Sequence, residues 1–411
     1  MPLIYLLAGE ASGDTIGGRL MAALVAARPG LAFAGVGGPR MQALGLHSLF
    51  PMADLAVMGL MEVLPRVRLL RRRVHEAAAD IVARRPDIVV SIDAPGFMLH
   101  VLKRVAPSGV KRIHYVAPQV WAWREHRVKS FPGIWDELLC LLPFEVAYFA
   151  SHDLPARFVG HPVLESGADT GDGAGFRARC GIAPNSPVLV LMPGSRRSEA
   201  PRLLPVFRAT LALLAQDVPD LVPVVPVAPA VAEIVQLATS DWPLRPIIVT
   251  GLADKHDAYA AASAALTKSG TSTLELALAG VPMAVTYRVN AVSAWMARRM
   301  IRVKHVAMVN LLAGRAVVPE LLQQECRPDR LAAVVRQMLR DPAVAAAQRA
   351  AFGPLLAGLH PPGETPSAAA AREILAVLDR PGGCGKRAGK GAALDPLGPA
   401  APDPVFLSKR P

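Results

Sequence analysis

The sequence predicts an α/β protein made of two doubly wound domains, each a parallel sheet with helices on both faces. Short apolar runs alternate with helical stretches from end to end, which is the pattern of parallel strands joined by crossover helices. The 411 residues are more than one ordinary core accommodates. A polar, glycine-rich interval at residues 165–175, which is predicted as a linker, then divides the alternation into two series.

Six apolar runs in the first half are predicted as strands, with helices such as Thr15–Ala27 and Val67–Arg84 between them. Continuous apolar runs are typical of strands that are buried on both faces. The predicted strands are Leu3–Ala8, Ala32–Val36, Asp87–Ile92, Lys111–Val116, Glu137–Leu142 and Arg157–Val159.

The pattern restarts after the interval, with a predicted helix at Glu199–Leu214 and an Ala- and Leu-rich helical region at 328–376. We therefore expect domains at 1–165 and 176–355, a C-terminal helix at 356–380 that could pack back on the first domain, and a disordered basic tail at 381–411. The predicted strands are Val188–Met192, Leu221–Val225, Pro246–Val249, Ala264–Thr267 and Met283–Tyr287.

Composition excludes several classes of protein. Apolar residues make up 52% and charged residues 19%, which excludes global disorder. The four cysteines are scattered without a CxxC pair, so neither a disulfide framework nor a zinc site is expected. The N-terminus has the pattern of a buried strand, and no run of about 20 uninterrupted apolar residues is present. We expect a soluble or peripheral protein.

The net charge of +12 calls for an anionic partner, either nucleic acid, acidic lipid or a phosphorylated substrate. Basic residues concentrate after Arg380 and at residues 66–73. Aromatic residues do not interleave with either cluster, as a groove for single-stranded nucleic acid would require. Nucleic acid is therefore the weaker interpretation.

The segment AGEASGD (8–14) follows the first strand and opens the first helix. Gly9 and Gly13 permit a tight turn, and Ser12 or Asp14 could cap the helix, so a purely structural turn is one interpretation. A purely structural turn does not need the carboxylate of Glu10, and the presence of this carboxylate favours a functional turn. A dinucleotide fingerprint is absent at Gly35–Gly38 because Arg40 replaces its third glycine, which disfavours a nicotinamide enzyme.

Two turns in the second half are typical of phosphate sites. Pro193–Arg196 and Ser269–Thr271 each follow a strand, so backbone N–H groups, with the charge of Arg196, could hold a diphosphate. Glu275 lies early in the next helix, where it could accept from two ribose hydroxyls. The structural alternative is a pair of ordinary N-caps and a glutamate that favours the helix dipole.

Asp93 ends an apolar strand within SIDAP (91–95). A carboxylate at the carboxyl edge of a parallel sheet faces the ligand crevice and could serve as a general base. The alternative is an N-cap for the helix that starts near Pro95.

Residues 57–73 combine large apolar side chains with five arginines, which is the composition of an element that lies in a membrane interface. A core helix with a solvated basic face is the alternative. The residues predicted to dock on the membrane are Met61, Val63, Leu64, Val67, Leu70, Arg71, Arg72 and Arg73.

Ten segments together resemble the lipid-A-disaccharide synthase family of glycosyltransferases, in the family's order and over residues 3 to about 330. HYVAPQVWAWR and AGEASGD are the specific ones. The segments are AGEASGD (8–14), GGPRMQALG (37–45), AVMGLMEVL (56–64), SIDAP (91–95), HYVAPQVWAWR (114–124), LPFE (142–145), FVGHP (158–162), MPGSR (192–196), SGT (269–271) and NLLAGR (310–315).

The resemblance implies a GT-B fold, that is, two Rossmann-like domains facing across a cleft, with no metal and no cofactor. It implies an inverting hexosyltransferase of lipid A biosynthesis, the pathway that builds lipopolysaccharide in Gram-negative bacteria. The enzyme would join UDP-2,3-diacylglucosamine to 2,3-diacylglucosamine 1-phosphate (lipid X), giving the β-1,6-linked disaccharide 1-phosphate and UDP. The expected location is cytoplasmic, peripheral on the inner face of the inner membrane, with no nucleic-acid partner.

The family's residue roles carry over to matching positions. The N-terminal domain would bind the acceptor and the membrane, with Asp93 as the base and Glu10 at the same site. The C-terminal domain would bind the UDP-sugar. Gly96, Met98 and Val309 depart from the family's usual residues. The UDP-binding residues implied are Gly194, Ser195, Arg196, Ser269, Gly270, Thr271, Glu275 and Asn310.

Three rivals stay open from the sequence. A UDP-sugar 2-epimerase or a different GT-B transferase would share both domains and the diphosphate turns, but it would not need the surface at 57–73. A nucleic-acid-binding protein would act through the basic tail. A membrane-surface scaffold is disfavoured by the carboxylates at the sheet edge.

Overall fold

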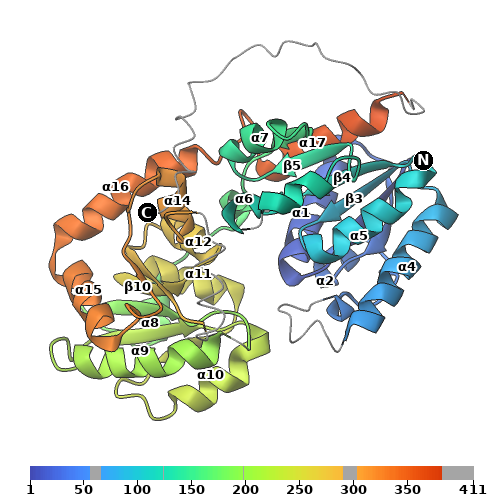
Figure 1. Cartoon of the computed structure of the whole chain (residues 1–411). Coiled ribbons are helices and arrows are strands. Elements are labelled where there is room, and N and C mark those ends of the chain that lie inside the picture. The colour runs from blue at the N-terminus through green and yellow to red at the C-terminus, as the bar shows by residue number, and fades with distance from the viewer. Residues whose placement is uncertain (56–65, 124, 198, 290–302, 382–411) are drawn as a thin grey trace. The chain divides into compact units, whose positions relative to one another are not determined.

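The computed structural model describes residues 1–55, 66–123, 125–197, 199–289 and 303–381, and these form two compact units (Figure 1). Of the described residues, the first unit comprises those of 1–162 and 359–381, and the second comprises those of 163–358. Each unit is built around one six-stranded sheet. This confirms the predicted α/β class with two parallel sheets. The predicted tail lies outside the described residues, apart from residue 381.

The sheet of the first unit has the order β2-β1-β3-β4-β5-β6, and every pair is parallel. Ala8 pairs with Ile92, and Ile92 pairs with Tyr115, so three neighbouring strands end at the same level. The loops that follow these strands therefore start side by side. The strands are β1 (Leu3–Ala8), β2 (Ala32–Val36), β3 (Ile88–Ile92), β4 (Lys111–Tyr115), β5 (Glu137–Cys140) and β6 (Ala156–Phe158).

Helices cover both faces of this sheet (Figure 1). Ile4 and Leu6 of β1 face the core with α1 (Ala11–Ala27) and α17 (Pro366–Asp379). The intervening Tyr5 and Leu7 face the opposite core, with α4 (Val67–Arg84) and α5 (Pro95–Val105). Because side chains alternate along a strand, one apolar run fills both cores.

The chain returns to the first unit after completing the second. Three alanines, at 369–371, are buried where α17 packs against α1. Lys111 of β4 donates to the backbone oxygens of Leu378 and Arg380, and Arg28 pairs with Asp379. The C-terminal helix therefore covers one face of the first sheet, although it begins at Pro366 rather than near residue 356.

The second sheet has the order β12-β11-β10-β7-β8-β9, and its pairs are parallel. All eleven predicted strands are confirmed, each to within two residues at either end. Strand β12 (Glu320–Leu322) was not predicted. The strands of this sheet are β7 (Val188–Met192), β8 (Val222–Pro226), β9 (Ile247–Val249), β10 (Ala264–Lys268), β11 (Met283–Tyr287) and β12.

Helices α9 (Ala200–Leu214) and α15 (Pro328–Arg340) pack together over one face of this sheet. The other described helices are distributed between the two units. They are α2 (Pro39–Gln42), α6 (Val120–Trp123), α7 (Pro143–Ala150), α8 (Gly173–Arg179), α10 (Ala232–Thr239), α11 (Leu252–Ala261), α12 (Ser272–Leu278), α14 (Met308–Ala313) and α16 (Pro342–Ala357).

The glycine-rich interval at 165–175 is not the open linker that its composition predicts. Helix α8 begins within it, capped by the side chain of Asp172, which accepts from the N–H of Gly175 at 2.8 Å. A Cβ on Gly171 would lie 2.1 Å from the carbonyl oxygen of His256. The glycines here permit close packing on α11, so this stretch belongs to the second unit.

Candidate active site

The carboxyl edge of the first sheet carries strained backbone. Asp93 and Ala94 follow β3 with φ of 55° and 44°, and Val116 follows the adjacent β4 with φ of 78°. A positive φ costs a non-glycine residue about 1–3 kcal/mol, and it is a genuine outlier for a β-branched one. Such residues gather at functional sites because the surrounding fold must hold them in place.

Asp93 is half-buried at this edge. Its N–H donates to the carbonyl of Tyr115 at 2.9 Å, which fixes the backbone. Its Oδ2 accepts from the hydroxyl of Ser12 at 3.2 Å, and its Oδ1 accepts no hydrogen bond from any residue that the structure describes. One carboxylate oxygen is therefore oriented while the other is available to a ligand.

The two predicted turns of the first unit meet. A Cβ on Gly9 would lie 2.9 Å from the Cβ of Ala94 and 3.2 Å from Cε of Met98. Only glycine permits this approach without displacement. Met98 is fully buried in the core, so this departure from the family's usual residue packs beneath the turn instead of facing a ligand.

Asp14 and Glu10 flank the same turn in different roles. The buried carboxylate of Asp14 accepts from the N–H groups of Gly38, Arg40 and Met41 at 2.9–3.1 Å. It therefore caps α2, and the prediction that it could cap its own helix is wrong, because both of its oxygens accept from this later segment. Glu10 occupies the N-cap position of α1 and is half-buried.

An aromatic turn follows Val116. The indole N–H of Trp121 donates to Oε1 of Glu145 at 3.1 Å. The other oxygen of Glu145 accepts from the N–H groups of Leu141 and Leu142. Burial raises the pKa of Glu145 to about 7. The segments 114–124 and 142–145, far apart in sequence, are thus joined by one buried carboxyl.

His114 supports the same edge, and the sequence did not single it out. Its Nδ1 lies 2.8 Å from the hydroxyl of Ser91 on β3, and its ring stacks on Trp135. Complete burial lowers the pKa of His114 to about 3, so the ring is neutral near pH 7.

In the second unit, a carboxylate lies between two cations at the end of β7. Oε1 of Glu199 is 2.9 Å from Nη1 of Arg196 and 2.9 Å from Nζ of Lys268. Gly194 has φ of 108°, and a Cβ there would lie 2.7 Å from Oε2 of Glu199. Neither Glu199 nor Lys268 was predicted, although Lys268 is the charged residue that ends the otherwise uncharged strand β10.

The Ser269–Thr271 turn follows β10 and is fixed at both ends. Ser269 donates to the carbonyl of Val306 at 2.8 Å, and Thr273 donates to that of Gly270 at 2.8 Å. Gly270 has φ of 153° with open space where a Cβ would stand. The backbone of this turn is thus accessible to a ligand.

Glu275 lies on α12, with one oxygen engaged. Its Oε2 accepts from Nζ of Lys255 at 2.9 Å and from the hydroxyl of Tyr259 at 3.3 Å. These bonds orient the carboxylate. Burial and the nearby charge of Glu275 raise the pKa of Tyr259, which keeps the phenol protonated as a donor.

Asn310 is buried, and its amide is saturated by protein groups. Its Nδ2 donates to the carbonyl of Val318 and to Glu320, both at 2.8 Å. Its Oδ1 accepts from the N–H groups of Val317 and Val318. An amide makes about four such bonds, so no polar atom is left for the predicted contact with UDP. Asn310 therefore holds the loop before β12 in place through these hydrogen bonds.

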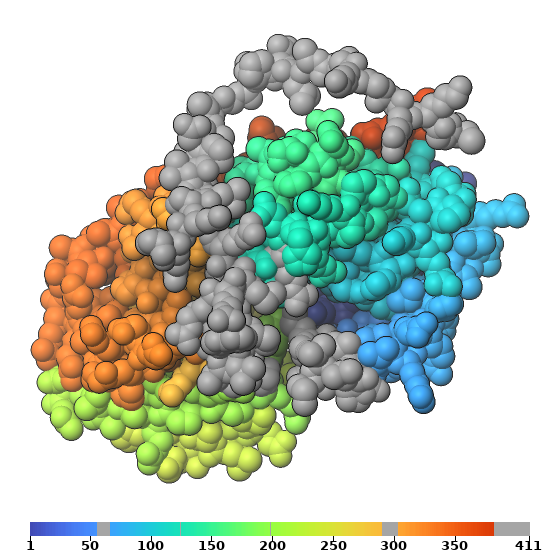
Figure 2. Space-filling view, viewed as in Figure 1, coloured from blue at the N-terminus to red at the C-terminus, as the bar shows by residue number. Residues whose placement is uncertain are grey.

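Helix α4 carries the described part of the predicted membrane surface; Met61, Val63 and Leu64 lie outside the described residues. Leu70 packs on the core, and Arg73 is paired with Asp54 and Glu76. Arg71 and Arg72 are exposed, as is Val67, and Figure 2 shows α4 in light blue at the surface of its unit. Neither arginine has an ion pair with a described residue.

Among the described residues, no group of three or more His, Cys, Asp or Glu side chains is placed to hold a metal ion. No helix in the same residues is long and apolar enough to cross a membrane.

Comparison with known proteins adds a family. The family model described as lipid-A-disaccharide synthetase matches residues 4–352. The chain is 62% identical to the lipid-A-disaccharide synthase of Gluconobacter oxydans over 379 residues, which cover 92% of this chain and 91% of that protein.

Solved structures share the fold at much lower identity. A structure of S. aureus MnaA with UDP has a TM-score of 0.62 at 13% identity, covering 91% of this chain and 95% of that one. The calicheamicin glycosyltransferase has a TM-score of 0.58 at 17% identity, covering 92% and 99%. These likenesses confirm the predicted GT-B fold and, at such identities, nothing further.

Proposed function

The chain belongs to the lipid-A-disaccharide synthase family, and from that premise we propose which of its residues carry the reaction. It is a glycosyltransferase that forms the lipid A disaccharide. The donor is UDP-2,3-diacylglucosamine and the acceptor is 2,3-diacylglucosamine 1-phosphate. The acceptor's 6-hydroxyl oxygen bonds to the donor's anomeric carbon from the face opposite UDP, and the carbon–oxygen bond to UDP breaks with inversion.

Asp93 takes the proton from the acceptor's 6-hydroxyl. The support is its free Oδ1, held by a fixed backbone and by the bond from Ser12 to the other oxygen. As oxygen attacks carbon, the carboxylate removes the developing positive charge, an effect typically worth about 10²–10⁴ in rate. Glu10, on the turn that touches Asp93 through Ser12, contributes a second carboxylate to the acceptor side.

The second unit holds UDP. Bound diphosphate would replace Glu199 as the partner of Arg196 and Lys268, and these cations would stabilise the charge on departing UDP. Gly194, Ser195 and the Ser269–Thr271 turn offer backbone N–H groups. Glu275, oriented by Lys255, accepts from the ribose hydroxyls.

Asn310 contributes to the UDP site by holding a loop in position and not by contacting UDP. Its saturated amide holds the loop that leads into β12, and Glu320, its partner, also accepts from the N–H groups of Val306 and Ala307. Val306 in turn accepts from Ser269. Asn310 therefore supports the Ser269–Thr271 turn from beneath.

Docking at the inner face of the inner membrane brings the enzyme to its acylated substrates. Arg68, Arg71 and Arg72 share one face of α4, at positions i, i+3 and i+4, and we call them the basic face of α4. Like charges at this spacing destabilise a helix, so their grouping favours an anionic surface outside the protein.

The experiment that tests the proposal is Asp93→Asn, assayed for transfer with both substrates. Transfer should fall by at least about a hundredfold, because the amide cannot accept the proton, while UDP affinity stays within about twofold. Asp220→Asn, an exposed aspartate of the second unit, is the control and should be unaffected. Near-normal turnover by Asp93→Asn would exclude it as the base.

A further inference from the structure

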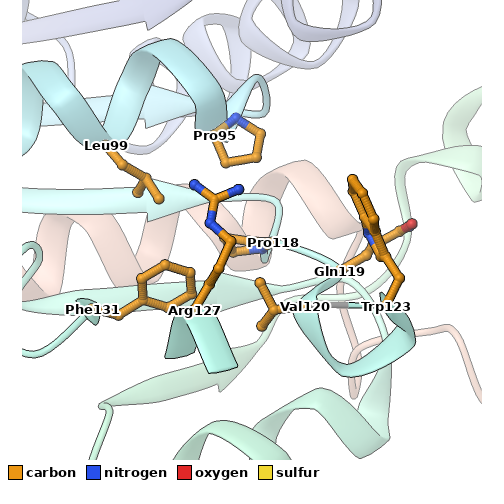
Figure 3. Close-up of a pocket in the computed structure, with 8 residues that line it drawn as sticks. All are labelled: Pro95, Leu99, Pro118, Gln119, Val120, Trp123, Arg127 and Phe131. Atoms are coloured by element: carbon orange, nitrogen blue, oxygen red, sulfur yellow. The ribbon is translucent and has the colours of Figure 1, made fainter. Parts of the chain in front are cut away.

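A pocket in the first unit is built from the segments that follow the two strained turns (Figure 3). Pro95 and Leu99 come from α5, which starts two residues after Asp93, and Val120 and Trp123 come from α6, which starts four residues after Val116. The pocket therefore adjoins the edge of the sheet where Asp93 stands, and the reaction proposed above does not yet use it.

The wall of this pocket is apolar. Leu99, Val120 and Phe131 are buried, whereas Trp123 is 44% exposed. Trp121, two residues earlier, points into the core and is fixed to Glu145, so the single turn of α6 presents Trp123 outward. An exposed tryptophan beside an apolar hollow offers surface to an apolar ligand.

Arg127 is the cation of the pocket, and Figure 3 shows its guanidinium extending toward Leu99 and Pro95. It is half-buried, yet it makes no ion pair or side-chain hydrogen bond with any described residue. Other half-buried or buried arginines of this unit are paired, Arg73 with Asp54 and Arg112 with Asp136. A guanidinium partly removed from water without a counter-ion is suited to an anion from a ligand.

We propose that this pocket binds the acceptor, with Arg127 on its phosphate and part of one acyl chain against Leu99, Val120 and Trp123. This inference rests on the proposed function, in which the donor's diphosphate is held by the second unit. The acceptor carries both an anionic group and apolar chains, and its 6-hydroxyl must reach Asp93. A pocket with one unpaired cation and an apolar wall next to that carboxylate matches both requirements.

The test is Arg127→Gln, assayed with 2,3-diacylglucosamine 1-phosphate and with the same sugar lacking the phosphate. With the phosphorylated acceptor, KM for the acceptor should rise by about tenfold or more, because a charge-assisted bond is lost, and KM for the donor should not change. With the unphosphorylated acceptor, variant and wild type should be equal. Arg104→Gln, an exposed arginine of α5, is the control for charge and should behave as wild type.

A second variant tests the apolar wall. Trp123→Ala should reduce the preference for a diacylated over a deacylated acceptor phosphate by about fivefold or more, and thermal unfolding should be unchanged because the side chain is exposed. If Arg127→Gln raises both acceptor KM values equally, or if neither variant alters acceptor KM, the pocket is not the acceptor site. If the wild type transfers no sugar to either acceptor, the proposed function itself fails.

Discussion

Asp93 occupies a backbone conformation that few residues tolerate. Aspartate and asparagine adopt positive φ more readily than other side chains, because their short polar groups bond to nearby backbone. Alanine at this position would change both the chemistry and the turn, whereas asparagine keeps the turn and removes only the basic oxygen. Loss of transfer in Asp93→Asn can thus be assigned to the proton.

Arg196 offers a prediction about the donor. Replacing it with glutamine should weaken UDP binding by about tenfold or more, since a charge-assisted bond to phosphate is lost. Calorimetric titration with UDP measures the effect. The matched control is Arg197→Gln, which removes the same charge from the next, exposed residue. Equal losses in the two variants would mean that only the general positive charge matters.

Two buried histidines predict acid sensitivity. Burial lowers the pKa of His114 to about 3 and that of His161 to about 4, from the ordinary value of 6.5. Below pH 6.5 the unfolded chain therefore binds more protons than the folded one, and their contribution to stability is lost as pH falls from 6.5 toward 4. Glu145 has the opposite effect on stability. Because its pKa is raised from 4.5 to about 7, the folded chain binds its proton more readily between these pH values, which offsets the loss from one histidine.

Comparing the wild type with a His114 variant isolates the contribution of His114 to the pH dependence of stability. His114→Asn keeps a polar atom near the place of Nδ1 but cannot titrate, so its free energy of unfolding should decline less than that of the wild type between pH 7 and 5. Urea unfolding at several pH values measures this, with the exposed His47→Asn as control. Parallel pH profiles for wild type and His114→Asn would contradict the assignment.

Some site residues could be predicted from the sequence and others could not. Asp93 and Glu10 stand in turns directly after strands, so local pattern predicts their place at the sheet edge. Glu199 and Lys268 meet only because β10 pairs with β7, which no local pattern reveals. Asn310 shows a third case, since an amide that binds a ligand and one that pins a loop look alike in sequence.

At the scale of elements, α4 has two distinct faces. Leu70, Val74 and Ile81 pack on the core, and the basic face lies opposite. Helical periodicity thus separates the predicted docking residues into those that hold the helix and those that remain exposed. The docking proposal concerns Val67, Arg71 and Arg72 with their neighbour Arg68.

Charge reversal on this helix predicts loss of membrane binding. Arg71→Glu combined with Arg72→Glu should lower binding to vesicles that contain anionic lipid by about tenfold or more, since each basic residue near such a surface contributes about 1 kcal/mol. Co-sedimentation measures the bound fraction. Lys103→Glu with Arg104→Glu reverses two exposed charges on α5 and serves as control. Undiminished pelleting of the α4 variant would refute docking through this face.

The strands were predictable because apolar runs bounded by turns encode them directly. Strand β12 was missed because its only apolar residues are Leu321 and Leu322, which stand between the polar Glu320 and Gln323. The prediction of a linker at 165–175 was wrong for a physical reason. Glycine marks both flexible linkers and places where two backbones touch, and only packing on α11 distinguishes the two.

At the scale of the whole molecule, fold and function are decided by different comparisons. Solved structures at 13–17% identity share the fold, and one of them is the calicheamicin glycosyltransferase, so the fold alone leaves the reaction open. Identity of 62% over most of the chain supplies the family. The rival epimerase, which shares the fold, is disfavoured by that membership.

The chain order also matters for the whole molecule. Because α17 completes the core of the first unit, residues at both ends of the described chain build one domain. The core of the unit that carries Asp93 and the pocket of Arg127 therefore includes residues from beyond the second unit in sequence. Local sequence pattern predicts α17 as a helix, but its partner α1 lies more than three hundred residues away.

The most direct test of the central claim is to mix the purified protein with UDP-2,3-diacylglucosamine and 2,3-diacylglucosamine 1-phosphate and to measure UDP and disaccharide together. UDP and disaccharide 1-phosphate should appear in equal amounts, and only when both sugars are present. Release of UDP from the donor alone, or conversion of the donor sugar without formation of a disaccharide, would contradict the account.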